Sequence, residues 1–88
     1  MISAEEIKKY VQQKKVIIGT ERTIKALKNG KILKVFISSN CKEDTRNDLE
    51  RYGKISSIEI IKLKFPNDEL GTICKKPFLI SVMGLKKE

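Results

Sequence analysis

Short runs of apolar residues, most of them β-branched, alternate along this chain with segments of helical periodicity. The runs cover residues 16–18, 35–37, 58–63 and 78–83. Runs of this length and composition are typical of buried strands. Because strands that are apolar on both sides need helices over both faces of their sheet, the pattern predicts an α/β (α+β) fold. We expect a three-layer α/β/α sandwich with the element order αβαβαβαβ.

The first helix is predicted from a capping sequence. Ser3-Ala4-Glu5-Glu6 has the S-x-x-E form of a capping box, with Ser3 as the N-cap. Ile2 and Ile7 then occupy the two positions of a hydrophobic staple. The apolar stripe continues at helical spacing, so we expect this helix to run to about residue 14.

The other three helices are predicted from their ends. Thr20 is a suitable N-cap for the second helix, and Asn29-Gly30 provides its left-handed stop. The third helix spans about residues 42–52 and is expected to end at Gly53. The fourth begins at Pro66 and is broken by Lys75-Lys76-Pro77.

The net charge of the chain indicates its class of partner. The 88 residues form one domain, 1–88, and carry 19 Lys and Arg against 11 Asp and Glu, a net charge of +8. An excess of this size on so small a body attracts polyanions, nucleic acid first and an anionic membrane surface second. No apolar run approaches the roughly 20 residues of a membrane span, and the N-terminus is unlike a signal peptide. We therefore expect a cytoplasmic protein.

The residue types needed for common catalytic sites are scarce. The chain has no histidine, which excludes a His base and His metal ligands. Its two cysteines, Cys41 and Cys74, form no CxxC pair, so neither zinc nor redox chemistry is expected. The acidic residues of the third helix alternate with basic ones, which favours surface ion pairs. We expect no catalytic residue, metal or cofactor, although an enzyme that uses Lys or a carboxylate stays open.

The first candidate site is the turn from the first strand into the second helix. It begins at Gly19 and presents unpaired backbone N–H groups, which attract anions. Arg22, Lys25 and Lys28 follow at intervals of three and share one flank of the helix. An ordinary capped and solvated helix is the alternative, and for any single lysine it is the more common case. No phosphate-binding glycine motif of a nucleotide site is present.

The second candidate site is Lys75-Lys76-Pro77-Phe78, just before the last strand. Proline stiffens the turn, the lysines can meet phosphates, and Phe78 can stack on a base. The alternative is that Phe78 simply begins a buried strand. In the expected sandwich, the loops after the first strand and before the last can meet at one end of the sheet.

Two blocks of this sequence resemble the kink-turn RNA-binding ribosomal protein superfamily. They are residues 16–25, V-I-I-G-T-E-R-T-I-K, and residues 69–78, E-L-G-T-I-C-K-K-P-F. The resemblance covers nearly the whole chain, from about Lys9 to Leu85, and the second block favours the L-thirty-e branch over its sibling, L-seven-A-e. It implies an α/β/α sandwich with a four-stranded mixed sheet that binds RNA through the two candidate loops.

The resemblance also implies roles for individual residues. Gly19 would let the backbone approach the RNA, and Pro77 and Phe78 would pack against an extruded nucleotide. The residues implied to face the sheared G·A pairs of a kink-turn are Thr20, Glu21, Arg22 and Lys25. One departure concerns the pair after the glycine turn, where many kink-turn binders carry Asn-Glu and this chain has Glu21-Arg22. Arginine suits the guanine O6 and N7 acceptors or phosphate, whereas a misplaced Glu21 would repel phosphate.

The function implied by the resemblance is that of a structural RNA-binding protein of the archaeal large ribosomal subunit. Its partners would be large-subunit ribosomal RNA and ribosomal proteins, and it would be ribosome-associated and monomeric when free. The alternative within the superfamily is a kink-turn-binding paralog in a guide-RNA or RNase P particle. A small enzyme and a protein–protein adaptor are the other classes that the sequence leaves open.

Overall fold

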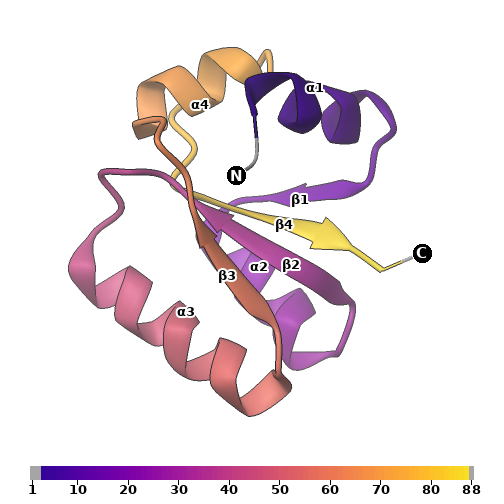
Figure 1. Ribbon diagram of the computed structural model, residues 1–88, viewed down its shortest axis with the longest axis vertical. Helices are drawn as coiled ribbons and strands as arrows, with labels where there is room; N and C mark the ends of the chain where they lie inside the picture. The colour runs from indigo at the N-terminus through magenta and orange to yellow at the C-terminus, as the bar shows by residue number, and fades with distance from the viewer. Residues whose placement is uncertain (1–2, 88) are drawn as a thin grey trace.

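The computed structural model describes residues 3–87, and within them the elements follow the predicted order. The helices are α1 (Ala4–Gln12), α2 (Thr20–Lys28), α3 (Glu43–Ser56) and α4 (Asn67–Ile73). The strands are β1 (Val16–Ile18), β2 (Ile32–Ile37), β3 (Glu59–Lys62) and β4 (Val82–Lys86). Helices α1 and α4 cover one face of the sheet, and α2 and α3 cover the other (Figure 1). The three-layer α/β/α sandwich is therefore confirmed.

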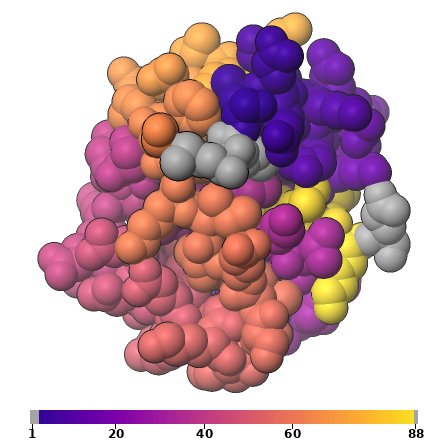
Figure 2. Space-filling view, viewed as in Figure 1, coloured from indigo at the N-terminus to yellow at the C-terminus, as the bar shows by residue number. Residues whose placement is uncertain are grey.

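The four strands form one mixed sheet in the order β1-β4-β2-β3. Strand β4 runs antiparallel to both of its neighbours, whereas β2 and β3 are parallel. The last strand of the chain thus lies in the middle of the sheet, and β1 and β3 form its edges. Figure 2 shows β3 at the surface of the molecule, as its edge position requires.

Side chains of the strands alternate between the two helical layers. The face toward α2 and α3 carries Ile17, Val35, Ile37, Ile60 and Val82, which pack with Ala26, Leu27 and Leu49. The face toward α1 and α4 carries Val16, Ile18, Phe36, Ile61, Met83 and Leu85, which pack with Ile7, Leu70 and Ile73. This alternation is the period of two that an extended chain imposes. It accounts for the continuously apolar strands in the sequence, because both faces are buried.

A bulge at the start of β2 changes this alternation. Ile32 is paired with Lys86 and Lys34 with Leu85, so one extra residue, Leu33, is inserted on the β2 side. The insertion puts Ile32 on the same face as Val35, where it is fully buried against the layer of α2 and α3. Leu33 is left 49% exposed.

The predicted helix starts are partly confirmed. The Ser3 hydroxyl accepts a hydrogen bond from the Glu6 N–H at 3.3 Å, as a capping residue should. Of the predicted staple, Ile7 is buried, and Ile2 lies outside the described residues. The prediction for Thr20 was wrong: Gly19 is the N-cap of α2, and Thr20 is its first helical residue. The residue at the cap must turn the chain sharply out of β1, and glycine does this without steric cost.

The prediction that Gly53 ends the third helix was also wrong. Helix α3 continues to Ser56 and ends at Ser57, which adopts the left-handed conformation with φ 57°. Gly53 is buried inside the helix, where a Cβ would lie 2.9 Å from the Ile58 carbonyl oxygen and 2.9 Å from the Ile60 Cγ1 atom. The glycine is thus required by the close approach of α3 to β3, not by a turn.

The last strand was predicted at residues 78–83, and this was wrong for the first four of these residues. Residues 78–81 form an irregular segment, and β4 spans Val82–Lys86 instead. Within that segment Ile80 is buried, and its N–H donates to the Asn67 carbonyl at 3.1 Å. Phe78 and Leu79 are 53% and 63% exposed. The apolar run is therefore divided between a surface loop and a strand.

Substitution of Gly53 by alanine tests the close approach of α3 to β3. In an exposed helix, alanine is more favourable than glycine by about 1 kcal/mol. At Gly53 we expect the opposite sign, a loss of about 1–3 kcal/mol in the free energy of unfolding, because the new methyl group overpacks against β3. Asn47→Ala, at an exposed position of the same helix, is the control and should be neutral or slightly stabilising. Urea denaturation of both variants measures this difference, and a stabilised Gly53→Ala protein would contradict it.

Candidate nucleic-acid interface

The turn between β1 and α2 is held in an unusual backbone conformation. Gly19 has φ 113° and ψ 146°, a region that side chains disfavour. Its N–H donates to the Val82 carbonyl at 3.0 Å, and its carbonyl accepts from the Thr23 N–H at 3.0 Å. No heavy atom lies within 4 Å of the place where its Cβ would stand. The backbone at this turn is therefore fixed from the inside and open on the outside.

The first turn of α2 offers donors and charge beside this glycine. Gly19 has no side chain to cap the helix, so no side-chain bond of the cap occupies the N–H groups of the first turn. Thr20 is half-buried, and Glu21 and Arg22 are exposed. Thr23 is fully buried, and its hydroxyl donates to the Ile17 carbonyl at 3.4 Å. This bond ties the helix to β1 and holds the exposed turn in place.

The loop between α4 and β4 begins with a well-defined helix end. Lys75 adopts the left-handed conformation, φ 57°. The Lys75 N–H donates to the Thr72 carbonyl at 3.0 Å, and the Lys76 N–H donates to the Gly71 carbonyl at 2.9 Å. These two bonds form a Schellman motif, in which a glycine is the usual residue at the position of Lys75.

Gly71 fixes where this loop goes next. A Cβ at residue 71 would clash with the Phe78 carbonyl oxygen, so the loop can fold directly over α4 only because residue 71 is glycine. Ile80 is buried beyond this contact and anchors the loop, while Phe78 and Leu79 stay at the surface. The exposed ring of Phe78 is consequently held by a backbone that is fastened on both sides.

The two predicted loops meet along the edge strand β1. A hollow of about 430 Å³ is lined by Val16, Ile17, Ile18, Arg22, Lys76 and Phe78. Arg22 comes from α2, and Lys76 and Phe78 come from the loop before β4. An apolar surface with a guanidinium, an ammonium and an aromatic ring around it suits both parts of a nucleotide, the base and the phosphate. The prediction that the loops lie at one place on the sheet is confirmed.

Not every predicted residue joins this hollow. Lys28 is the last residue of α2, and its Nζ atom lies 5.0 Å from the centre of the Tyr52 ring. Lys28 comes eight residues after Thr20, which places it about 12 Å farther along the helix axis. Lys25 is exposed one turn into the helix, and Lys75 and Pro77 lie in the loop without lining the hollow. Gly19, Thr20 and Glu21 lie in the adjoining turn, outside the lining. The structure therefore groups Arg22, Lys76 and Phe78 and sets Lys28 apart.

Two features of this surface were missed in the sequence. Leu79 is 63% exposed beside Phe78, but the apolar run to which it belongs was assigned to a strand. The edge of β1 forms the floor of the hollow, and nothing in residues 16–18 distinguishes an edge strand from a central one. Pro77 was the available signal for Leu79, because a proline at the start of an apolar run argues against a central strand.

The other chemically suggestive residues lie elsewhere. Asp48 pairs with Arg51 at 3.2 Å on α3, as the charge pattern predicted. Burial raises the pKa of the Cys41 and Cys74 thiols, which keeps both neutral. Among residues 3–87 no three Cys, Asp or Glu side chains are grouped so that they could hold a metal ion. In the same part of the chain, no helix has both the length and the apolar character that crossing a membrane requires.

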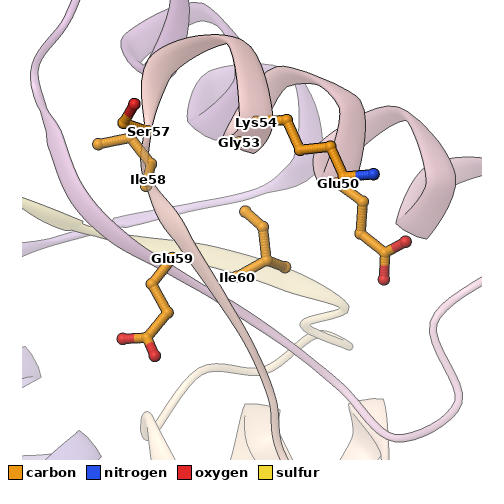
Figure 3. Close-up of a pocket in the computed structure, with 7 residues that line it drawn as sticks. All are labelled: Glu50, Gly53, Lys54, Ser57, Ile58, Glu59 and Ile60. Atoms are coloured by element: carbon orange, nitrogen blue, oxygen red, sulfur yellow. The ribbon is translucent and has the colours of Figure 1, made fainter.

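A second hollow, of about 480 Å³, lies between the end of α3 and β3. Its lining consists of Glu50, Gly53, Lys54, Ser57, Ile58, Glu59 and Ile60 (Figure 3). This set contains two carboxylates, Glu50 and Glu59, and one ammonium group, Lys54, and Glu50 also pairs with Lys62 at 3.5 Å. With Lys62 counted, the charges at this hollow balance and leave no net positive charge for a polyanion, so we assign the candidate interface to the edge of β1, where Arg22 and Lys76 stand without an acidic residue in the lining.

The fold and this surface together define a class: small, basic α/β/α sandwiches with a mixed sheet and a candidate binding surface on one sheet edge. Comparison with known families identifies one family within this class. The profile of the ribosomal protein L7Ae/L30e/S12e/Gadd45 family matches residues 2–88. The chain belongs to this family. The resemblance found in the sequence is confirmed.

Individual relatives and solved structures agree with this placement. The chain is 42% identical over 83 residues to the large ribosomal subunit protein eL30 of Sulfolobus acidocaldarius, covering 94% of this chain and 80% of the relative. It is 41% identical over 68 residues to eL30 of Methanothermobacter thermautotrophicus, covering 77% of this chain and 69% of the relative.

Two solved structures show the same fold at low identity. A Bacillus halodurans protein of unknown function has a TM-score of 0.88 at 21% identity, over 96% of this chain and 83% of its own. A 15.5kD RNA binding protein of Giardia lamblia has a TM-score of 0.83 at 15% identity, over 97% of this chain and 71% of its own.

The surface position of Phe78 gives a stability test. Because the ring is more than half exposed, Phe78→Ala should lower the free energy of unfolding by about 1 kcal/mol or less. Ile80→Ala, two residues later in the same loop, removes a side chain that is 1% exposed and should cost about 2–5 kcal/mol. Thermal and urea unfolding of the two variants measure this contrast. Equal losses would mean that Phe78 is part of the core.

Proposed function

We propose that this protein is a structural RNA-binding component of the archaeal large ribosomal subunit, where it binds a kink-turn or a related internal loop of ribosomal RNA. Its role is to hold RNA, without catalysis, in cytoplasmic ribosomes. Ribosomal proteins are its neighbours there, and the free protein is a monomer. The names of the eL30 relatives support the ribosome over a guide-RNA or RNase P particle, and the name of the Giardia protein supports RNA as the ligand.

The observation that carries the proposal is the meeting of Arg22, Lys76 and Phe78 on the edge of β1. The guanidinium and ammonium groups bind phosphates and replace condensed counterions. The exposed ring of Phe78 stacks on an unpaired base, an interaction worth about 1–3 kcal/mol. A kink-turn or internal loop supplies both ligands, because it exposes bases that a regular helix keeps stacked.

Gly19, Glu21 and Arg22 complete the proposed interface. The open space outside Gly19 lets RNA approach the backbone, and no cap side chain occupies the first N–H groups of α2. Arg22 donates to phosphate or to the O6 and N7 atoms of guanine. Glu21 is also exposed and is a hydrogen-bond acceptor, so it fits only where the RNA presents base N–H donors and no phosphate.

The charged and aromatic parts of this interface make separable contributions to binding. With a kink-turn hairpin as the probe, the double variant Arg22→Ala/Lys76→Ala should reduce the slope of log affinity against log salt by about 1.5, because two phosphate contacts are lost. Phe78→Ala should lower the affinity by about 1–3 kcal/mol and leave that slope unchanged, because stacking releases no counterions. Filter binding or fluorescence anisotropy at several salt concentrations measures both quantities.

The matched control for the double variant is Arg46→Ala/Lys54→Ala, which removes the same two charge types from α3. Ile55→Ala, at a position 75% exposed on α3, is the control for Phe78. Equal effects of the interface variants and their controls would mean that the hairpin binds by net charge alone, and the proposal would fail.

The left-handed conformation of Lys75 allows stability and binding to be separated. A glycine there relieves a backbone conformation that costs an ordinary residue about 1 kcal/mol, so Lys75→Gly should stabilise the protein by up to that amount. The same variant should bind the hairpin less tightly, because it removes a charge from the loop. Lys14→Gly is the matched control, since Lys14 has φ 55° and follows α1 in the same way. It should gain stability and keep its affinity, and loss of affinity in both variants would contradict the assignment of Lys75.

A further inference from the structure

A second basic surface lies at the other end of β1 from Gly19. Three chain segments are tied together there by the backbone. The Lys86 N–H donates to the Lys15 carbonyl at 2.8 Å, and the Lys87 N–H donates to the Lys31 carbonyl at 2.9 Å. Lysines from the segment after α1, from the segment before β2 and from the end of β4 are thus brought to one place, although they are distant in the sequence.

These lysines surround an apolar hollow. It has a volume of about 550 Å³ and is lined by Tyr10, Lys15, Leu33, Leu85, Lys86 and Lys87. A smaller hollow beside it, of about 430 Å³, shares two of these residues and is lined by Glu6, Lys9, Tyr10, Gln13 and Lys15. In Figure 2 the end of β4 (yellow) reaches the surface beneath α1 (indigo). Four lysines and one glutamate line the two hollows together.

The packing of the core explains only part of this apolar floor. Leu85 is buried, and the Tyr10 ring stacks on Phe36 with ring centroids 6.3 Å apart. The exposed part is Leu33. Leu33 is the extra residue of the β2 bulge and is 49% exposed. The bulge places it with Tyr10 and Leu85 in the hollow. Bulges commonly redirect a side chain next to a functional site. An exposed leucine beside a tyrosine and several lysines combines a surface for a base with donors for phosphate, as in the interface on the edge of β1.

We propose that this surface, defined by Tyr10, Lys15, Leu33, Lys86 and Lys87, binds a second segment of the same RNA. The inference rests on the proposed RNA-binding function and adds a second contact to it. Strand β1 is three residues long, so about 10 Å of extended backbone lies between Gly19 and Lys15. The two hollows share no lining residue, so a short hairpin that contacts Arg22, Lys76 and Phe78 is expected to leave the second surface open, and a large folded RNA that brings another strand alongside engages both.

The capping role of some of these lysines does not account for the surface. Lys14 is the left-handed residue after α1, and the Lys15 N–H donates to the Tyr10 carbonyl at 3.0 Å, so both belong to a helix end where cations are favoured. Lys86 and Lys87 end a strand and have no such role. Their charges, together with the exposure of Leu33, are what the second RNA segment explains.

The test compares a short and a long RNA. The variant is Lys86→Ala/Lys87→Ala, and the control is Lys54→Ala/Lys64→Ala, which removes the same charge from exposed positions elsewhere. On an isolated kink-turn hairpin, both should bind within about twofold of the unmodified protein. On transcribed archaeal large-subunit ribosomal RNA, we expect the first variant to lose about tenfold in affinity and about 1.5 in salt slope, and the control to lose no more than about twofold.

A photo-crosslinking residue provides a second readout. Placed at Leu33, it should crosslink to ribosomal nucleotides different from those reached from Phe78. Equal losses for the variant and its control on the long RNA, or no crosslink from Leu33, would overturn the inference. Loss of binding to phosphatidylserine vesicles by the variant, with ribosomal RNA binding unchanged, would overturn it in favour of a membrane. Failure of the unmodified protein to bind the hairpin would instead refute the proposed function itself.

Discussion

The hydrogen-bonded pairing of β4 with β1 on one side and β2 on the other is the interaction on which the rest of this structure depends. Strand β4 comes last in the chain and lies inside the sheet, between β1 and β2. Strand β1 is therefore joined to the β2–β3 pair only when β4 is in place. Its ends also set both basic surfaces. The Val82 carbonyl holds Gly19 at one end, and Lys86 is bonded to Lys15 at the other.

Close packing in the middle of β4 explains a residue that strand propensity disfavours. Gly84 is paired with Ile17 and Val35, and a Cβ there would lie 2.8 Å from the Ile32 Cδ1 atom and 3.1 Å from the Thr23 Cγ2 atom. The lack of a side chain allows α2 to pack close to the sheet, and Thr23 on that helix bonds the Ile17 carbonyl. The position of the turn at Gly19, and so of the candidate interface, follows from this contact.

The sequence predicts most of this fold because its local signals agree with its tertiary packing. The β-branched runs, the Ser3 cap and the positive φ of Gly30 all follow from short-range rules. The failures occur where distant contacts override those rules. Gly53 has the appearance of a helix stop, but it serves the packing of α3 on β3. No short-range pattern encodes which residues β3 will bring close.

The part of the candidate site that could be predicted from the sequence is the meeting of its two loops, because the order of helices and strands places them close together. The two basic loops were expected to meet, and Arg22, Lys76 and Phe78 do. The three-residue spacing that also included Lys28 is correct about the helix face, but it says nothing about position along the axis. One flank of a helix extends over its whole length, and Lys28 lies at the end where Tyr52 faces it.

Three exposed apolar residues are not needed for the fold and are better explained by binding of RNA. A protein with 15% identity keeps this fold at a TM-score of 0.83, since a core needs only apolar side chains of suitable volume in the right pattern. Phe78, Leu79 and Leu33 lie outside that requirement, because each is about half exposed or more. These side chains add little to the stability of the fold, because much of their apolar surface stays in contact with water. The chain around them carries a net charge of +8. Phe78 lines a hollow with Lys76, and Leu33 lines another with Lys15, Lys86 and Lys87. An RNA that offers unstacked bases next to phosphates covers both kinds of group at once.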